Sequence, residues 1–277
     1  MDDTDHIAVV QLGPDDAVAG LALSAEANWN QNETDWRVFL NHGTVLGVRD
    51  NGGRLIATAA LLPYTCGNAW ISMVLVTASA RRRGLATRLV DCCLDAASQQ
   101  GLTPWLDATP AGAAVYGPLG FVPTLQLRRL RLEHSTASKD EPLLGCSPND
   151  LELLVARDIS AMGFDRSTLL AELGRRANSR LLSSHGAMAL VRDGRKARHI
   201  GPLFADNPDR ALAMVDTIAR SETRPLLIDA VSTQAEFLQG LTDSGWTIER
   251  PFQRMRFGRA GVQPAELPFA VAGPEFG

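Results

Sequence analysis

The 277-residue chain contains one short pattern twice, and this repetition constrains its fold more than any other feature. In each copy an apolar-Asp-Ala triplet comes first, then a glycine followed by an aromatic residue, and last an Arg-x-Arg segment. The first copy has these features at residues 106–108, 120–121 and 129–131, and the second copy has them at residues 228–230, 245–246 and 254–256. Because three agreements occur in one order with similar spacing, the pattern predicts an internal duplication.

The first copy has the periodicity of a mixed α and β fold. Turn residues at 50–53 and 63–68 separate three apolar runs, which predicts an antiparallel meander. Residues 84–99 then change to a helical period, with an apolar stripe that ends before Gly101. The order predicted is one strand, two helices, three strands, a helix, a strand, a helix and a strand, at residues 7–12, 13–25, 29–40, 44–48, 55–62, 69–76, 84–99, 103–108, 111–119 and 122–132.

A polar, proline-bearing stretch at residues 136–149 is the predicted linker. It divides the chain into an N-terminal domain at residues 1–135 and a C-terminal domain at residues 150–277. In the second domain we expect helices at 150–156, 167–177, 208–220 and 234–244, and strands at 187–192, 197–204, 225–231 and 246–257. The predicted fold class is α+β, with two tandem domains that each contain a mostly antiparallel mixed sheet flanked by helices.

Composition narrows the classes of function. Apolar residues make up 45% of the chain and charged residues 21%, and the net charge of −4 gives no reason to expect a nucleic-acid surface. No apolar run approaches the ~18 residues that span a bilayer, and the acidic N-terminus is unlike a signal peptide. The four cysteines and five histidines lack metal-binding spacing. We therefore expect a cytoplasmic protein with no metal, no nucleic-acid partner and no membrane partner.

Residues 74–87 carry the clearest chemical signal, since a strand leads through a turn directly into an amphipathic helix. A helix N-terminus has unpaired N–H groups and partial positive charge, so it can accept a pyrophosphate. Gly84 and Ala86 keep the backbone uncovered, and Arg81, Arg82 and Arg83 add charge and forked donors. The alternative is an exposed basic turn that merely starts a helix, but its place after an apolar strand favours anion binding.

This turn resembles the coenzyme A signature of the GNAT superfamily of N-acetyltransferases, Q/R-x-x-G-x-G/A. Residues 114–121 resemble a second hallmark of that family, in which alanine, an aliphatic residue and tyrosine precede a Gly-Phe pair. The resemblance covers residues 5–133 strongly. Through residues 200–205 and 254–256 it extends more faintly to the second copy, which resembles the C-terminal half of tandem bacterial GNAT proteins.

The resemblance implies that the cosubstrate is acetyl-CoA and that its acetyl group passes to a primary amine of a small molecule or peptide. It implies that Val74, Leu75 and Val76 offer backbone groups to the pantetheine arm and the thioester. The cofactor-binding residues implied at the turn and the helix start are Arg81, Arg82, Arg83, Gly84, Leu85, Ala86 and Thr87. The family often has proline and an aromatic residue within this turn, where the present chain has Ala78 and Ala80, but this difference removes no backbone donor.

Tyr116 corresponds, by the same resemblance, to the tyrosine that protonates the departing thiolate. A phenol has a pKa of ~10, so it is protonated at neutral pH and can donate a proton as charge develops on sulfur. The alternative is that Tyr116 only packs against Phe121. Two further aromatic residues of the first helices, Trp29 and Trp36, together with Tyr64, could form walls for an acceptor, although packing in the core is the favoured interpretation.

No general base is identified. Glu26 and Asp35 lie in the helical region that lines the acceptor site in this fold, and Asp107 lies on the strand next to the cofactor strand. For Glu26 and Asp35 the alternative is that they are solvated carboxylates on a helix face, which is the more common case. A water molecule that passes the proton to backbone carbonyls would serve as well.

The second copy lacks the residues that this chemistry needs. Its equivalent turn, residues 203–210, has no glycine, carries the negative charges of Asp206 and Asp209, and contains Pro208, which has no N–H. The nearest aromatic residue to the expected position of Tyr116 is Phe237, which cannot donate a proton. We therefore predict a degenerate copy that covers the acceptor cleft or stabilises the first half, with one active site per chain.

Two other functions are compatible with the pattern: an acyl-CoA sensor that does not turn over, and a structural protein with a vestigial fold. A sensor needs no acid near the sulfur, so Tyr116 favours the acyltransferase. The chain is expected to be a monomer or a homodimer.

Overall fold

The computed structural model describes residues 8–133, 149–259, 264 and 266–277. The first half consists of β1 (Val9–Gln11), the 3-10 turn η1 (Pro14–Asp16), α1 (Ala17–Glu26), α2 (Glu33–His42), β2 (Thr44–Arg49), β3 (Leu55–Tyr64), β4 (Asn68–Val76), the 3-10 turn η2 (Ala78–Ala80), α3 (Leu85–Gln99), β5 (Thr103–Ala108), α4 (Pro110–Tyr116) and β6 (Phe121–Leu132). The second half consists of α5 (Asp150–Met162), α6 (Ser167–Arg175), β7 (Arg180–Ser184), β8 (Ala187–Arg192), β9 (Arg198–Ala205), α7 (Pro208–Ser221), β10 (Leu226–Val231), α8 (Ala235–Asp243) and β11 (Thr247–Phe257).

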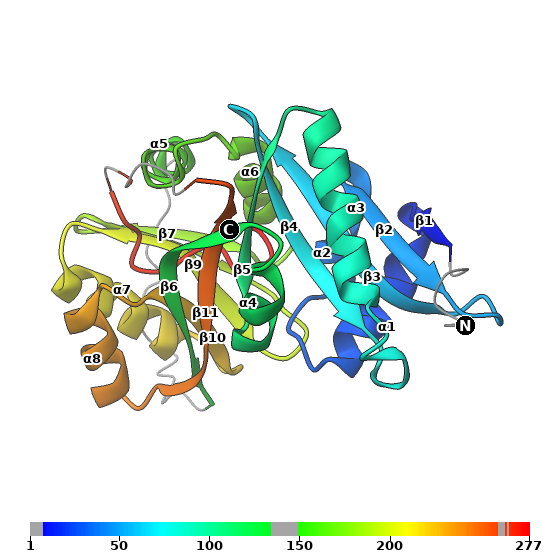
Figure 1. Ribbon diagram of the computed structural model, residues 1–277. Coiled ribbons are helices and arrows are strands. Elements are labelled where there is room, and N and C mark those ends of the chain that lie inside the picture. The colour runs from blue at the N-terminus through cyan, green and yellow to red at the C-terminus, as the bar shows by residue number, and fades with distance from the viewer. Residues whose placement is uncertain (1–7, 134–148, 260–263, 265) are drawn as a thin grey trace.

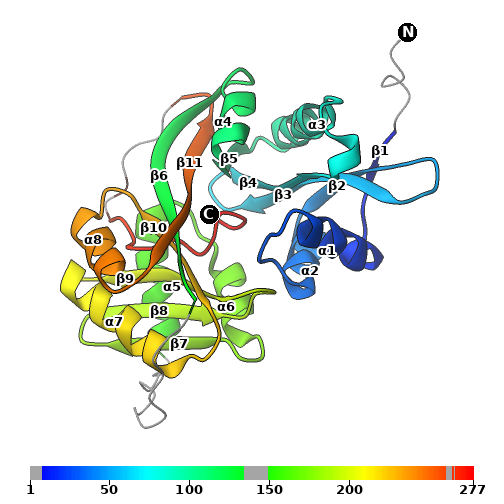
Figure 2. The same cartoon turned by 90° about the horizontal axis from the view of Figure 1, so that it is seen from below.

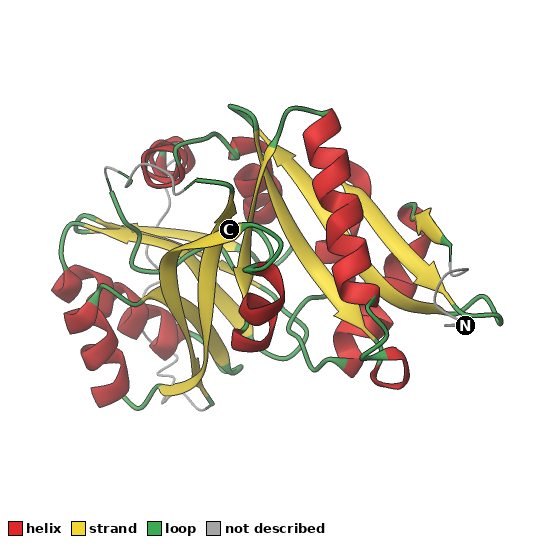
Figure 3. Cartoon of the chain, in the orientation of Figure 1, coloured by secondary structure: helices red, strands yellow, loops and turns green. Residues whose placement is uncertain are grey.

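The eleven strands of the described residues form one mixed sheet, in the order β1-β2-β3-β4-β5-β11-β6-β10-β9-β8-β7 (Figure 1). The β4–β5 and β9–β10 pairs are parallel, and the other pairs are antiparallel. The predicted fold class is confirmed, although the two expected sheets are joined into one. In both halves helices cover both faces of the sheet (Figure 3); α1 and α2 lie on the face opposite α3 (Figure 2).

The predicted elements are present; two helices differ clearly in extent, and one strand was not predicted. The helix expected from residue 29 begins at Glu33, because the side chain of Asn32 accepts a hydrogen bond from the Asp35 N–H at 3.0 Å and caps the helix there. The helix expected at residues 150–156 continues to Met162. Strand β7 was not predicted, because its sequence, RLLSS, is short and half polar.

The two halves exchange their last strands. Strand β11 of the second half lies between β5 and β6, and β6 of the first half lies between β11 and β10. With β1 set aside, the order of the sheet reads as two equivalent halves arranged head to head around the β11–β6 pair. The predicted linker at residues 136–149 lies outside the described residues except for Asn149, so the domain boundaries remain a prediction.

The repeated Asp and Arg of the sequence meet across the exchanged strands. Arg254 of β11 donates to both carboxylate oxygens of Asp107 on β5, at 2.9 and 2.9 Å. In the same way Arg129 of β6 donates to both oxygens of Asp229 on β10, at 2.8 and 2.7 Å. Both carboxylates are fully buried. The sequence repeat therefore records a pair of equivalent buried ion pairs, each of which joins one half to the other.

The last residues of the chain run between the two halves, where Figure 2 places the C-terminus. Residues 269–271 lie between β9 and β10, beyond the point where these strands stop pairing. The backbone N–H groups of Leu203 and Val231 donate to Ala270 and Phe269 at 2.9 and 3.0 Å. A Cβ atom on Gly201 would lie 2.0 Å from the Val271 carbonyl oxygen, so only glycine admits the segment here.

Candidate active site

Strands β4 and β5 separate partway along their length. Their parallel pairing is recorded for residues 68–70 of β4 with 103–105 of β5. Beyond that point a cavity lies between them, lined on one side by Ile71 to Val74 and on the other by Leu106 to Thr109. Its empty space, open mouth included, is about 620 Å³. The parting strands thus expose backbone edges to a space that a ligand can enter.

A β-bulge in β4 lies at this cavity. The pairing with β3 shifts register after Thr58, and Met73 has a φ of 51°. The Thr58 hydroxyl donates to the Met73 carbonyl at 2.8 Å and stabilises this irregular backbone. A bulge bends its strand and turns backbone groups away from the ladder. Met73 and Val74 therefore meet the cavity with backbone that is not in regular strand geometry.

Tyr116 is the last residue of α4 and lines the same cavity. Its ring packs near Phe121, with centroids 6.2 Å apart, as the packing interpretation expects; the acid role stays a prediction. A Cβ atom on Gly112 would lie 3.0 Å from the ring, so the glycine makes room for it. The hydroxyl makes no hydrogen bond to any residue that the structure describes. Burial, with a smaller effect of the Cys93 thiol, raises the pKa of Tyr116 to about 12.

The turn after β4 has the backbone that the sequence predicts. Gly84 precedes α3 with a φ of 72°, and Arg82 has a φ of 61°. No side chain caps the helix, and its first internal bond runs from Arg88 N–H to the Gly84 carbonyl at 3.0 Å. The preceding N–H groups therefore have no partner within the helix. Arg81, Arg82 and Arg83 are exposed around them.

The predicted cofactor residues fall into two groups. Val74 lines the cavity, while Leu75 turns its side chain into the core and Val76 is half buried. Arg81 to Thr87 lie past the end of β4, where the Arg81 Nε donates to the Val76 carbonyl at 3.3 Å. Their roles in binding remain predictions.

Glu26 holds the start of this turn. Its carboxylate accepts hydrogen bonds from the Thr77 hydroxyl at 2.7 Å and from the Ala78 N–H at 2.6 Å. The bond from the Ala78 N–H and that from Thr77 lower the pKa of Glu26. A carboxylate stabilised in this way is a weak base. The contacts of Glu26 instead indicate that it orders the turn.

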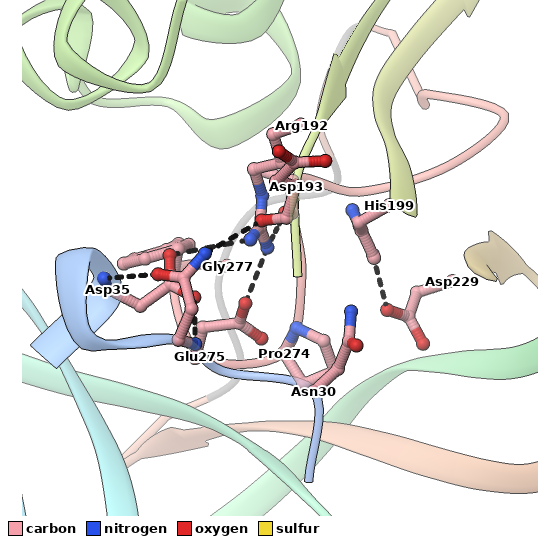
Figure 4. Close-up of polar contacts among 12 residues, drawn as sticks. Asn30, Asp35, Arg192, Asp193, His199, Asp229, Pro274, Glu275 and Gly277 are labelled. Carbon is pink, nitrogen blue, oxygen red and sulfur yellow. Dashed lines mark hydrogen bonds and ion pairs between the residues drawn. The ribbon is translucent and has the colours of Figure 1, made fainter. Parts of the chain in front are cut away.

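The other two candidate bases are also bound. Asp35 is buried and lies 2.6 Å from an Arg176 nitrogen and 3.5 Å from Arg192, whose guanidinium also contacts Glu275 at 2.5 Å (Figure 4). Asp107 lines the cavity but forms the two-bonded pair with Arg254 described above. None of the three carboxylates considered from sequence is free.

The aromatic residues divide between wall and core. Trp36 is fully buried, with its Nε1 donating to the Ser24 hydroxyl at 2.9 Å. Tyr64 stacks on Phe164, and its hydroxyl donates to the Phe276 carbonyl at 2.8 Å. Trp29 alone of the three lines the cavity.

Residues of the second half complete the cavity of the first half. The sequence did not reveal which residues these are. Arg250 and Phe252 of the exchanged strand β11 line it, together with Pro274 and Glu275 of the last segment. Arg250 was not identified as a site residue, because only the strand exchange brings it to the cavity that Tyr116 also lines. No local sequence signal would have found it.

The loop between α1 and α2 is also fixed by the second half. Asn30 is buried and exchanges hydrogen bonds with Ala197: its Nδ2 donates to the carbonyl at 3.0 Å, and its Oδ1 accepts from the N–H at 3.0 Å. The Arg195 N–H donates to the Asn30 carbonyl at 2.7 Å. The neighbours Trp29 and Gln31 are thereby held against the cavity.

The equivalent opening in the second half is filled. Strands β9 and β10 also stop pairing partway, after Ile200 and Ile228. Residues 269–271 occupy the gap and satisfy the backbone edges, as described above. Asn207 caps α7 through a bond from the Arg210 N–H at 3.0 Å, whereas α3 has no such side-chain cap.

None of the described helices combines the length and the apolarity that crossing a membrane requires. Among the same residues, no three His, Cys, Asp or Glu side chains are grouped so that they could hold a metal ion.

Comparison with known proteins identifies the class. Residues 17–121 match the Acetyltransferase (GNAT) family, and residues 154–267 match an Acetyltransferase (GNAT) domain. The chain therefore belongs to the GNAT superfamily, carries two such domains in tandem, and is an acyltransferase.

Particular relatives agree with this assignment. The chain is 25% identical over 236 residues to the uncharacterized N-acetyltransferase YitH of Bacillus subtilis. This match covers 82% of this chain and 83% of that protein. A structure from Pyrococcus horikoshii, provisionally assigned as an acetyltransferase, has a TM-score of 0.80 at 21% identity and covers 99% of this chain and 96% of its own. A tandem GNAT protein from the clavulanic acid biosynthesis pathway has a TM-score of 0.64 at 15% identity and covers 92% and 100%. These two structures share the fold with this chain.

Proposed function

We propose that the first half transfers an acetyl group from acetyl-CoA to a primary amine, with Tyr116 as the proton donor to the departing sulfur. The observation that carries the proposal is the cavity between the parting strands β4 and β5, where Tyr116 has a hydroxyl without a hydrogen-bond partner among the described residues. An acid placed beside a backbone edge is the arrangement that thioester transfer needs.

The residues of the turn fit the diphosphate of coenzyme A. Gly84 has no Cβ to cover the N-terminus of α3, and no heavy atom lies within 4 Å of the place where one would stand. The unpaired N–H groups, the helix dipole and the exposed arginines favour an anion there. Residues 74–76 of β4 then lead from that turn to Tyr116, so that the predicted cofactor residues form one path.

When bound, acetyl-CoA supplies an activated acyl group with a thiolate as leaving group. Tyr116 keeps its proton at every physiological pH, because burial holds its pKa near 12. Glu26 orders the turn through Thr77 and Ala78. Since Glu26, Asp35 and Asp107 are bound, we assign no carboxylate as base, and the amine proton leaves through water in the open cavity.

The second half supports a single site per chain. Its residues 269–271 lie where the pantetheine arm would have to pair, and Asp206 and Asp209 flank its turn. The second half instead contributes walls to the first cavity and fixes the loop at Asn30. This agrees with the expectation of a degenerate copy.

The test is to mix the protein with acetyl-CoA and a panel of amines and to follow release of free thiol. Tyr116→Phe should lower kcat by about 10²-fold or more, with the Kd for acetyl-CoA unchanged within about twofold, because the phenol acts only as sulfur departs. In the wild type kcat should show no alkaline decline between about pH 7 and 10. Tyr64→Phe is the matched control: it removes the other tyrosine hydroxyl of the chain and should leave kcat within about threefold.

An equal rate for Tyr116→Phe and wild type would contradict the acid role. Binding of acetyl-CoA without turnover of any amine would instead favour a sensor. The structure gives no observation that favours that alternative.

A further inference from the structure

The lining of the first-half cavity contains three buried side-chain polar atoms that have no hydrogen-bond partner among the described residues. They are Gln31 Oε1, Ser72 Oγ and Arg250 Nε. They come from the α1–α2 loop, from β4 and from the exchanged strand β11. Buried polar atoms are nearly always hydrogen-bonded, so unsatisfied ones on the lining residues of one open cavity mark places where water, or a ligand that displaces it, supplies the partners.

The charges around this cavity leave one guanidinium unmatched. Asp107 pairs with Arg254, Arg129 pairs with Asp229, and Glu275 pairs with Arg192. Arg250 has no ion pair or hydrogen bond among the residues that the structure describes, and its guanidinium lies 5.1 Å from the Phe252 ring. Arg129 lies 5.2 Å from the same ring, so the two cations flank one aromatic side chain.

This arrangement costs free energy without a ligand. Burial, and then the nearby positive charge of Arg129, lower the pKa of Arg250. A partly buried guanidinium that carries its charge beside a second one is stabilised by an anion at that place. Asp229, Glu249 and Glu275 attract this charge, but none of the described carboxylates forms an ion pair with it.

We propose that Arg250 binds a carboxylate on the acceptor, so that the substrate is an amine that also carries a carboxylate, as an amino acid does. This inference rests on the proposed function and deepens it. The donors of Arg250 match the carboxylate, while Gln31 Oε1 and Ser72 Oγ accept hydrogen bonds that an amine or ammonium donates. Trp29, Phe252 and Pro274 give the cavity apolar walls for the body of the molecule.

A carboxylate fits better than a phosphate monoester. One unmatched positive charge is neutralised by one negative charge, whereas a phosphate monoester carries about −1.5 to −2 at pH 7. A carboxylate is also planar and can accept two parallel bonds from one guanidinium. Its recognition thus comes from the second half of the chain, while the cofactor is held by the first.

The experiment measures binding directly, so that it does not depend on turnover. Wild-type protein saturated with coenzyme A is titrated calorimetrically with matched pairs of amines: L-phenylalanine and 2-phenylethylamine, L-leucine and 3-methylbutylamine, and L-lysine and 1,5-diaminopentane. At least one carboxylated member should bind about tenfold or more tightly than its decarboxylated partner, as expected for a charge-assisted hydrogen bond. Arg250→Gln should reduce that ratio to within about twofold.

Arg250→Lys retains the charge and should keep part of the preference, which a purely structural role would not predict. Arg37→Gln, on the exposed face of α2, is the control with the same change of charge and should keep the full preference. Equal binding of both members of every pair, no binding of any member, or a preference that survives in Arg250→Gln would each overturn the proposal. If carboxylated amines bind through Arg250 but no thiol is released from acetyl-CoA, the inferred ligand stands and the proposed transfer fails.

Discussion

The two clefts of the molecule start from the same fold and end in opposite states. In each half a parallel strand pair stops pairing partway along, between β4 and β5 and between β9 and β10. The first opening leads into a cavity that reaches Tyr116, and the second is filled by residues 269–271 of the same chain. The two openings therefore differ in what lies against their backbone edges: a cavity in the first half and a segment of the chain in the second.

The comparison shows two ways in which a duplicated domain can treat an opened strand pair. Backbone N–H and C=O groups that are buried without partners cost free energy, so an opened strand pair needs something to fill it. In the second half the chain supplies the partner itself, with Gly201 leaving room for it. In the first half no described segment fills the opening, and the edges line the cavity.

The largest expected effect tests whether the two buried ion pairs are equivalent. Arg254→Ala leaves Asp107 buried without its paired cation and should lower the free energy of unfolding by ~3–5 kcal/mol. Arg129→Ala should cost roughly 1 kcal/mol less, because His199 Nε2 still donates to Asp229 at 2.9 Å. Urea unfolding measures both. Arg37→Ala, in an exposed pair with Glu33, should change stability by less than about 0.5 kcal/mol.

A greater loss for Arg129→Ala than for Arg254→Ala would break this comparison. It would mean that His199 does not stabilise Asp229 in the absence of the arginine. The neutral form of His199 is the one expected in the protein, since burial, and then Arg192, lower its pKa.

Hydrogen exchange sharpens the contrast between the clefts. Peptides that contain residues 71–76 of β4 should exchange more slowly when acetyl-CoA is added, by up to about a hundredfold at a cofactor concentration of 100 times Kd. Peptides that contain Leu203 or Val231 should be protected with or without the cofactor, because the last segment already holds their N–H groups. Cofactor-dependent protection in the second half would show that its cleft still binds.

The smallest expected effect concerns the turn before α3. Reversing the charges of Arg82 and Arg83 to Glu should raise the Kd for acetyl-CoA by about tenfold at low salt and by less at high salt. Arg175→Glu with Arg210→Glu makes the same change of net charge on the second half and should leave the Kd within about twofold. Calorimetry should give one acetyl-CoA per chain in every case; a stoichiometry of two would contradict the single site.

Much of each half could be predicted from local pattern. The meander, the stripe of α3 and the glycine that starts it follow from residues close together in the chain, so their periodicity records their structure. The turn at Gly84 and the helix that carries Tyr116 were predicted for the same reason. The repeated Asp and Arg were predicted as equivalent positions, and the structure shows that they form equivalent pairs.

The strand exchange could not be predicted, and the reason lies in the repeat itself. Because β6 and β11 carry the same Arg-x-Arg pattern, either strand could pair its arginine with either Asp107 or Asp229. Local sequence cannot distinguish those two pairings. The position of Arg250 at the cavity depends on the exchange, so it was missed as well. The last segment, with Pro268, Gly273 and Pro274, has no period that would predict its place between β9 and β10.

The position of β11 between β5 and β6 also matters during translation. When the first half leaves the ribosome, the edge of β5 that faces away from β4 lacks its partner β11. That partner is absent until residues 247–257 have been synthesised. At about 5–20 residues per second this delay is on the order of ten seconds. A nascent chain in that interval presents an unpaired strand edge to other nascent chains. A gene cut between the two repeats would therefore encode two fragments that each expose an unpaired strand edge.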